Sequence, residues 1–180
     1  DDLLDYFQRP KCDDVRLSIA SVRASTVTQK LAQTLASHDT RSITIAIESG
    51  SERMRRLVNK KLEPEQIEAA AVNAKQGGLK GIKFYGMVGL PEETDTDVDA
   101  TVQLLKSLKR QVPGLRLTLG CSTFVPKAHT PFQWMGVDPT AQKRLKRLQK
   151  GLRPDGIDFR PESYNWSIIQ ALLSRGDRRL

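Results

Sequence analysis

Short apolar stretches alternate along the chain with longer stretches in which apolar residues recur every three or four positions. The short stretches are typical of buried strands, and the longer ones are typical of helices that pack on a sheet. Because strands and helices alternate, the pattern predicts an α/β fold with a parallel sheet and right-handed crossovers. We predict strands over residues 15–20, 42–47, 81–88 and 115–124.

Proline, glycine and capping residues predict where the helices begin and end. Ser49 and Glu52 have the spacing of a capping box, so a helix is expected to begin near Ser51. Pro at the first turn and Gly after the last turn are the usual signals at the two ends of a helix. The other helices are predicted over about 26–37, from Pro64 to Gly77-Gly78, and after Thr94 or Asp95.

The pattern changes after Trp134. A basic helix is predicted to begin at Asp138-Pro139, and a connection rich in Pro and Gly separates it from a last helix that carries Trp166. We therefore predict two parts, an α/β part over residues 1–135 and a basic helical extension over residues 136–180.

The 180 residues suffice for one domain with a buried core, and the formal net charge is +8. Residues 143–153 contain six basic side chains and no acidic one, a run that can attract the phosphates of RNA. Leu145, Leu148 and Leu152 recur at helical spacing within the same run. We favour a solvated face of an amphipathic helix, because no aromatic residues alternate with the charges.

Cysteine, histidine and hydropathy narrow the function classes. Cys12 and Cys121 are too few and too far apart for a disulfide framework, and with His38 and His129 they make no metal-binding set. No stretch approaches the roughly 18 apolar residues that a membrane helix requires. We therefore expect a reducing, cytoplasmic setting and no membrane partner.

The carboxyl ends of parallel strands meet at one edge of a sheet, where ligands of α/β proteins bind. Glu48 and Ser49 close the second predicted strand, and Phe124 and Val125 close or follow the fourth. The Glu48 carboxylate can accept hydrogen bonds from the two hydroxyls of a ribose, or it can pair with nearby Arg53. The spacing leaves both interpretations open.

The third predicted strand ends in Gly-Leu-Pro-Glu-Glu, residues 89–93. Gly89 would let a planar ring lie on the backbone, or it serves a tight turn and nothing more. Glu92 and Glu93 suit a helix N-terminus with or without a ligand. The segment lacks Gly-x-Gly-x-x-Gly and the Lys-Ser/Thr pair of phosphate loops, so a phosphate-binding loop is not predicted.

Three segments follow one another in order: Ile-Glu-Ser-Gly-Ser-Glu-Arg-Met-Arg-Arg-Leu-Val-Asn-Lys (47–60), Lys-Phe-Tyr-Gly-Met-Val-Gly-Leu-Pro-Glu-Glu-Thr (83–94) and Ser-Thr-Phe-Val-Pro-Lys-Ala-His-Thr-Pro-Phe-Gln-Trp (122–134). Together they resemble the radical S-adenosylmethionine (SAM) enzymes, and most of all the uncharacterised members that carry a cobalamin-binding domain upstream. The resemblance implies a segment of a partial (β/α)6 TIM-like barrel, with the four predicted strands as its third to sixth.

In that family, residues at the strand ends surround the adenosine of SAM. The resemblance implies that Glu48 contacts the ribose and that Lys60 contacts the methionine carboxylate. Residues of the third predicted strand and its turn would back the adenine, and those after the fourth would offer it backbone groups. The whole implied cofactor-binding set is Glu48, Ser49, Lys60, Met87, Gly89, Glu92, Glu93, Phe124 and Val125.

The chain departs from the family in one respect. It contains no Cys-x3-Cys-x2-Cys loop for a [4Fe-4S] cluster, and two distant cysteines cannot replace three convergent thiolates. We therefore expect the C-terminal part of a longer enzyme, or less simply a degenerate subunit, whose partner is the missing N-terminal half. That enzyme would cleave SAM reductively, with cobalamin as a further cofactor, and act on an unknown substrate by means of a 5′-deoxyadenosyl radical.

Several expectations follow for the chain by itself. It should be inactive alone, and the open edge of its sheet should form a dimer or be covered by a terminal segment. The alternative function is a module that binds RNA or another acidic partner through its basic helix. A doubly wound nucleotide-binding domain is a third interpretation, which strand order decides.

Overall fold

The computed structural model describes residues 2–178, so Asp1 and the end of the predicted extension, residues 179–180, lie outside it. One parallel sheet contains four strands in sequential order, each paired with the next. A sequential order has no switch point, which excludes the doubly wound interpretation and agrees with a barrel segment. The strands are β1 (Ser42–Glu48), β2 (Gly81–Val88), β3 (Arg116–Thr123) and β4 (Asp158–Pro161).

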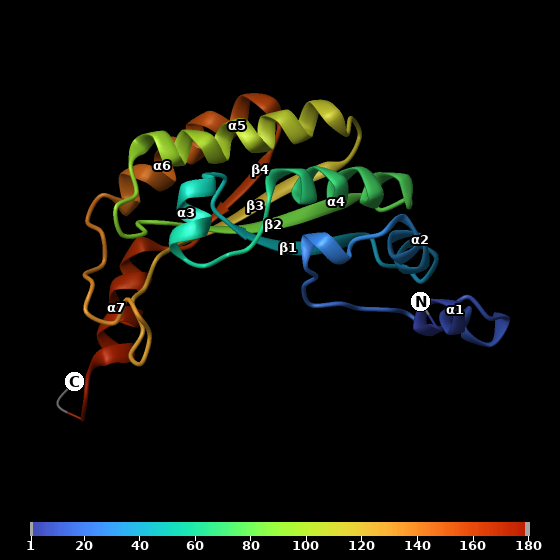
Figure 1. The fold of residues 1–180 in the computed structure, drawn as a ribbon, viewed down its shortest axis with the longest axis horizontal. Helices are drawn as coiled ribbons and strands as arrows, with labels where there is room; N and C mark the ends of the chain where they lie inside the picture. The colour runs from blue at the N-terminus through green and yellow to red at the C-terminus, as the bar shows by residue number, and fades with distance from the viewer. Residues whose placement is uncertain (1, 179–180) are drawn as a thin grey trace.

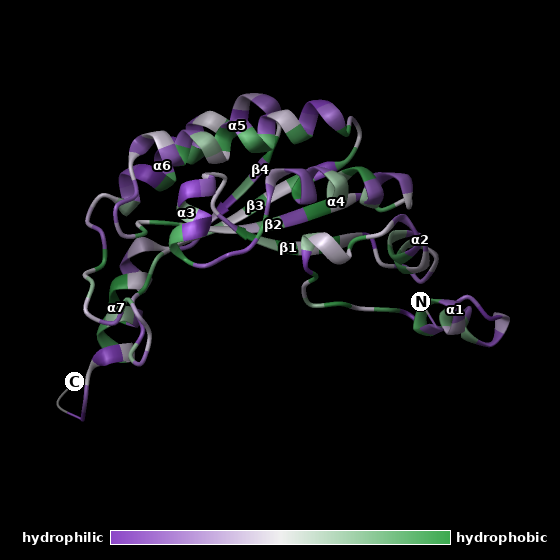
Figure 2. Cartoon of the chain, viewed as in Figure 1, coloured by the Kyte–Doolittle hydropathy of each residue, from purple (hydrophilic) through white to green (hydrophobic). Residues whose placement is uncertain are grey.

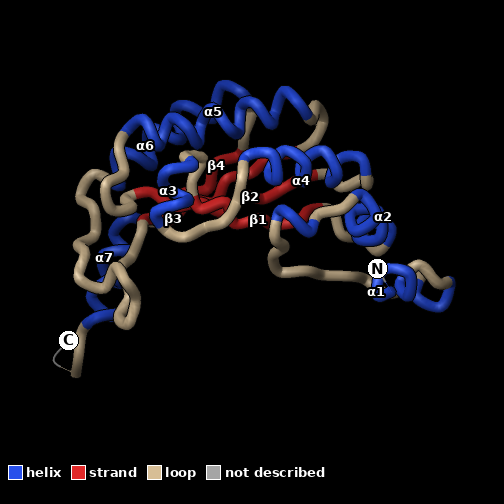
Figure 3. Tube along the Cα trace, viewed as in Figure 1, coloured by secondary structure: helices blue, strands red, loops and turns tan. Residues whose placement is uncertain are grey.

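Helices α3 to α6 lie over one face of this sheet, whereas α1 and α7 project beyond its two ends (Figure 1). Figure 3 shows the strands as one layer beneath those helices. The helices are α1 (Asp2–Phe7), α2 (Gln29–Ser37), α3 (Glu52–Leu57), α4 (Pro64–Gln76), α5 (Asp95–Gln111), α6 (Ala141–Leu152) and α7 (Tyr164–Arg175), and short 3-10 turns cover Pro10–Cys12, Ala24–Thr26 and Arg153–Asp155.

The core lies between the sheet and its helices. Alternate residues of β1 are buried, because successive side chains of a strand point to opposite faces. Ile43, Ile45 and Ile47 are at most 2% exposed, and they pack in one cluster with apolar residues of the covering helices. Those helices are apolar on the side toward the sheet and polar outside (Figure 2). The other face carries exposed side chains such as Lys83 and Tyr85; we call it the open face.

Most predicted elements are confirmed, with small shifts at their ends. The second, third and fourth predicted strands are β1, β2 and β3, and α4 begins at Pro64 as expected. Thr94 caps α5 in a capping box with Asp97. The predicted cap of α3 is wrong, however, because its N-cap is Ser51, whose side chain accepts a hydrogen bond from the Met54 N–H.

The first predicted strand, residues 15–20, is also wrong. This segment is extended but forms no ladder, although it lies beside the β1 edge: the Leu17 N–H donates to the His38 carbonyl, and the Val22 N–H donates to the Thr44 carbonyl. The fourth strand of the sheet is instead β4, which falls in the connection rich in Pro and Gly that we predicted between the last two helices. Part of the chain therefore lies along one sheet edge, and dimerisation stays a prediction.

The basic helix, α6, buries Leu145, Leu148 and Leu152 as expected. Two of its basic side chains are held by acidic residues elsewhere in the fold. Arg144 is ion-paired with Glu93 and Asp138, and Arg147 is ion-paired with Asp95 and Asp99. Acidic residues from other segments thus neutralise two of the basic side chains in the run, and less positive charge is left to bind RNA.

The described residues include no helix whose length and hydropathy would suit it to crossing a membrane.

Candidate functional site

Glu48 is the last residue of β1, and its backbone is unusual. Its φ of 62° lies in the left-handed region, which is uncommon for a residue with a side chain, and the β1–β2 register shifts between Ala46 and Glu48. The shift re-aims the side chain at the strand end. The Glu48 Oε1 accepts a hydrogen bond from Lys60 Nζ at 3.0 Å, and among the described residues Oε2 has no partner.

The Glu48–Lys60 pair answers one question that the sequence left open. Arg53, the expected ion-pair partner of Glu48, instead pairs with Asp97 and donates to the Glu92 carbonyl. Lys60 takes that place, and its side chain is 34% exposed while that of Glu48 is 22% exposed. A half-buried ion pair with a free carboxylate oxygen can still accept hydrogen bonds from a ligand.

The turn after β2 is closed by a buried carboxylate. Gly89 has a φ of 80°, and its N–H donates to Glu93 Oε2 at 2.6 Å. Arg144 Nη1 donates to the same oxygen at 3.1 Å. Burial raises the pKa of Glu93 to about 7, although both the Gly89 N–H and the Arg144 charge favour the ionised form.

This arrangement separates the acidic residues predicted for the site. The Glu93 side chain is 1% exposed, and its carboxylate is bonded to Gly89 and Arg144, so it shapes the turn. Glu92 is exposed, with a φ of 61°. A Cβ on Gly89 would lie 3.1 Å from both Asp138 and Ala141, so the missing side chain makes room for the start of α6.

Ser49 serves the backbone after β1. It is 2% exposed, and its Oγ accepts a hydrogen bond from the Ser51 N–H at 3.1 Å. Arg55 was not predicted, yet its buried guanidinium donates to the carbonyls of Ser49, Gly50 and Leu62. The loop after Glu48 is therefore fixed by its own hydrogen bonds.

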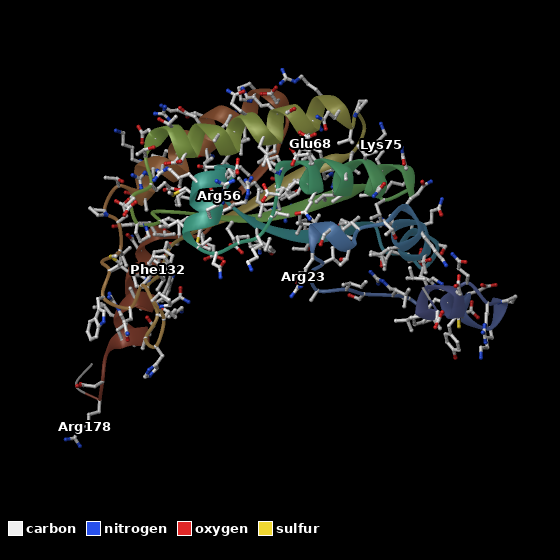
Figure 4. All side chains as sticks on the ribbon, in the orientation of Figure 1. Arg23, Arg56, Glu68, Lys75, Phe132 and Arg178 are labelled. Atoms are coloured by element: carbon white, nitrogen blue, oxygen red, sulfur yellow. The ribbon has the colours of Figure 1, made fainter. Side chains whose placement is uncertain are left out.

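Phe124 and Val125 extend the same edge beyond β3, and both are half-buried. The Phe124 N–H donates to the Val88 carbonyl at 2.8 Å, which ties the ends of β2 and β3 together. The Phe124 ring meets Phe132 edge-to-face at 5.6 Å. Figure 4 labels Phe132 in the loop beside α7, and Arg175 of α7 donates to carbonyls of the same loop.

Asp97 links the start of α5 to the start of α3. It accepts hydrogen bonds from the Ser51 hydroxyl at 2.6 Å, from Thr94, and from Arg53. Partial burial raises the pKa of Asp97, but the bonds from Ser51, Arg53 and Thr94 outweigh that effect and hold the pKa well below its usual range. A helix start at Thr94 or Asp95 was predicted, whereas the link from Asp97 to α3 was not.

The residues present do not suit an iron–sulfur cluster. Cys12 and Cys121 are both buried, and burial raises the pKa of the Cys121 thiol far above its ordinary value. A cluster needs accessible thiolates that converge. Within residues 2–178, no three Cys, His, Asp or Glu side chains gather as metal ligands would.

The segment that contains the ends of β1 and β2 matches a known protein family. Residues 5–105 match the model of the radical SAM superfamily. The chain belongs to the radical SAM superfamily. The matched residues include Glu48, Lys60 and the 89–93 turn, whereas Phe124 and Val125 lie beyond them.

Two curated relatives extend this finding. An uncharacterised protein of Methanocaldococcus jannaschii is 34% identical over 166 residues, which cover 92% of this chain and 36% of that protein. An uncharacterised methyltransferase of Pyrococcus horikoshii is 32% identical over 89 residues, 49% of this chain and 19% of the relative. The chain thus spans little more than a third of the length of the longer-matching relative.

A solved structure supports the fold. Coproporphyrinogen III oxidase of Escherichia coli, described as a radical SAM enzyme, matches with a TM-score of 0.50 and 18% identity. The match covers 74% of this chain and 30% of that one. The four parallel strands with flanking helices are therefore similar to part of the radical SAM barrel.

Proposed function

We propose that this chain is the part of a radical SAM enzyme that forms the adenosine wall of the SAM site. The observation that carries the proposal is the shared edge of Glu48 and Gly89, which end or follow neighbouring parallel strands. Glu48 pairs in register with Gly86, three residues before Gly89, so the two strand ends stand side by side. Such carboxyl edges hold the ligands of parallel α/β folds.

Several residues of this edge have distinct roles in the proposal. Glu48 Oε2, which has no partner in the described structure, accepts hydrogen bonds from the ribose hydroxyls. Lys60 orients Glu48 and offers its charge to the methionine carboxylate. Met87 and Phe124, both half-buried, supply apolar surface for the adenine. Ser49 and Glu93 act indirectly, since each holds a backbone turn at this edge.

The cluster ligands belong to another part of the enzyme in this proposal. When SAM is bound to a reduced [4Fe-4S] cluster, it supplies radical chemistry that removes hydrogen from a substrate. This chain positions the adenosine and shields it from water, and by itself it is inactive. The limited share of the M. jannaschii relative that the chain covers supports a larger whole.

Methyl transfer is the reaction class that we favour for the whole enzyme. The support is the name of the P. horikoshii relative, an uncharacterised methyltransferase. The resemblance to members with an upstream cobalamin-binding domain adds a methyl carrier to the same proposal.

An NMR titration of the 180-residue chain with S-adenosylhomocysteine tests the adenosine wall. We expect the largest amide shifts at residues 48–50, 87–89 and 124–125. Glu48→Gln should reduce the affinity by at least about tenfold, since one charge-assisted hydrogen bond contributes roughly 1.5–3 kcal/mol. The control is Glu52→Gln, an exposed position on α3. Shifts that gather at another edge, or equal effects of the two substitutions, would contradict the proposal.

Reconstitution with iron and sulfide tests the statement about the cluster. We expect no stoichiometric [4Fe-4S] absorption from this chain, because both of its thiols are buried. A full cluster per chain would overturn that part of the proposal.

A further inference from the structure

Basic side chains without acidic partners gather in one part of the molecule. On the helix side, Arg144 and Arg147 are ion-paired. At the amino ends of the strands, by contrast, basic side chains surround two adjoining cavities.

The larger cavity has a volume of about 710 Å³ and extends from the loops before β1, β2 and β3 onto the open face. The second, of about 670 Å³, lies between residues 16–20 and β1. Both are lined by Arg41 and Lys83, so they form one hollow, which we call the amino-edge basin. Its basic lining residues are Arg16, Arg41, Lys80, Lys83, Arg116 and Arg160.

Most of these charges have no partner. Arg160 is ion-paired with Asp158 at 2.8 Å. Within residues 2–178, the other five make neither an ion pair nor a side-chain hydrogen bond, and Asp39 is the acidic residue that lines the basin. Like charges around a concave surface repel one another and focus a positive potential into it. An anion in the basin would relieve that repulsion.

The strand register connects the basin with the candidate SAM site. Lys83 lies in register with Thr44 and Thr118, and Thr118 lies in register with Asp158, so the four residues form one row across the open face. Tyr85 and Met87 follow Lys83 on the same face of β2. At about 3.3 Å per residue, Lys83 stands roughly 13 Å from Met87.

We propose that the amino-edge basin binds a small organic anion with two or more phosphate or carboxylate groups. Several unpaired cations at one cavity select multiple negative charge over a single one, and guanidinium groups bind both kinds of oxyanion in a bidentate manner. The cavity is of the size that small-molecule ligands occupy.

The position of the basin also indicates a substrate class for the enzyme, an inference that rests on the proposed function. An anion held at Lys83 and Arg116 would extend along the open face toward Met87, where the adenosine wall begins. Tyr85, which is 52% exposed and lies over Gly120, offers an aromatic surface between the two ends. The substrate is then an anionic molecule whose charged end is remote from the reacting carbon.

Calorimetric titration of the 180-residue chain with pyrophosphate and with tricarballylate, at low and high salt, tests the inference. The basin variant is Lys83→Gln with Arg116→Gln. The control, Lys143→Gln with Lys150→Gln on α6, removes the same charge from exposed positions. Circular dichroism checks that each variant is folded. We expect saturable binding that weakens at least tenfold in the basin variant, weakens with salt, and stays within about twofold in the control.

The two probes identify the chemistry: preference for pyrophosphate indicates phosphoryl groups, and preference for tricarballylate indicates carboxylates. Absence of saturable binding, or equal losses in both variants, would overturn the inference. So would tighter binding of single-stranded oligonucleotides with affinity that rises with length. Binding of either anion without the expected S-adenosylhomocysteine shifts would refute the adenosine wall and leave the basin, and the reverse result would refute only the basin.

Discussion

Glu93 closes the turn that Gly89 begins, through a hydrogen bond of 2.6 Å from the Gly89 N–H to Glu93 Oε2. The same oxygen accepts from Arg144 of α6, and the Arg144 guanidinium also reaches the Glu93 carbonyl and Asp138. A turn at the candidate site is therefore connected to a helix more than 50 residues later in the chain. The contribution of this turn to stability can therefore be tested by substituting Arg144, which lies outside the candidate site.

Arg144→Met should destabilise the chain by about 3 kcal/mol, since a buried ion pair that loses one partner leaves an uncompensated charge. Glu93 would then bind a proton more readily. Urea unfolding measures the change. Arg147→Met is the matched control: its pairs with Asp95 and Asp99 are exposed, so water screens them and the loss of stability should be much smaller. Equal losses in the two variants would show that the Arg144 contact is no more important than a surface pair.

Stability should fall between about pH 4.5 and 7 because of Glu93. Its pKa is raised from 4.5 to about 7 by burial, so the folded state keeps a proton that the unfolded state releases in this window. Stability from this group is thus present at low pH and lost as the pH rises, by on the order of 3 kcal/mol. Unfolding free energies at pH 4.5 and 7.5 should show this loss in the wild type and not in Glu93→Gln. The exposed variant Glu92→Gln should behave as the wild type, and a loss shared by Glu93→Gln would assign the effect to other groups.

Gly89→Ala should be more destabilising than Gly114→Ala. Both glycines have positive φ, 80° and 87°, so both substitutions cost about 1–2 kcal/mol of backbone strain. A Cβ at position 114 meets open space, whereas one at position 89 meets Asp138 and Ala141 at 3.1 Å. Thermal unfolding of both variants isolates this packing difference. Equal effects would mean that α6 adjusts freely around the turn.

Asp97→Asn should destabilise the chain at pH 7 by about 1–3 kcal/mol, because Asp97 accepts charge-assisted hydrogen bonds from Arg53, Ser51 and Thr94. Its pKa is lowered, so the stabilisation is present above pH 4 and is lost as the pH falls through the folded pKa. The gap between wild type and variant should therefore narrow below pH 4. Asp99→Asn, at an exposed pair with Arg147, should cost less than 1 kcal/mol. A gap that is constant with pH would refute the role of the Asp97 charge.

The sequence predicted those elements whose formation depends on burial of apolar residues alone. β1, β2 and β3 are apolar runs between turn signals, and burial alone makes them strands. Residues 15–20 alternate apolar and polar side chains but make only isolated hydrogen bonds beside β1, and Val15 and Ile19 are exposed. Alternation in a sequence therefore does not show whether a segment finds a partner strand. β4 escaped prediction because it has four residues, follows Gly156 closely and ends at Pro161, and Gly and Pro usually indicate a loop.

The candidate site was less predictable, because its contacts join distant segments. The position of Glu48 at a strand end followed from the pattern, but its pairing with Lys60 and not with Arg53 depends on how α3 ends. Glu93 resembled a ligand contact in the sequence, and only the approach of Arg144 across 51 positions shows that its carboxylate is occupied. The position of such a residue along the chain therefore places it near a site but does not show which partner its side chain contacts.

The division between an apolar and a polar side of the sheet bears on biosynthesis. One side is already sealed by helices from the same polypeptide, and the other presents hydrophilic groups that water solvates well. We expect this region to reach its native structure as it leaves the ribosome, without another polypeptide covering its hydrophilic side.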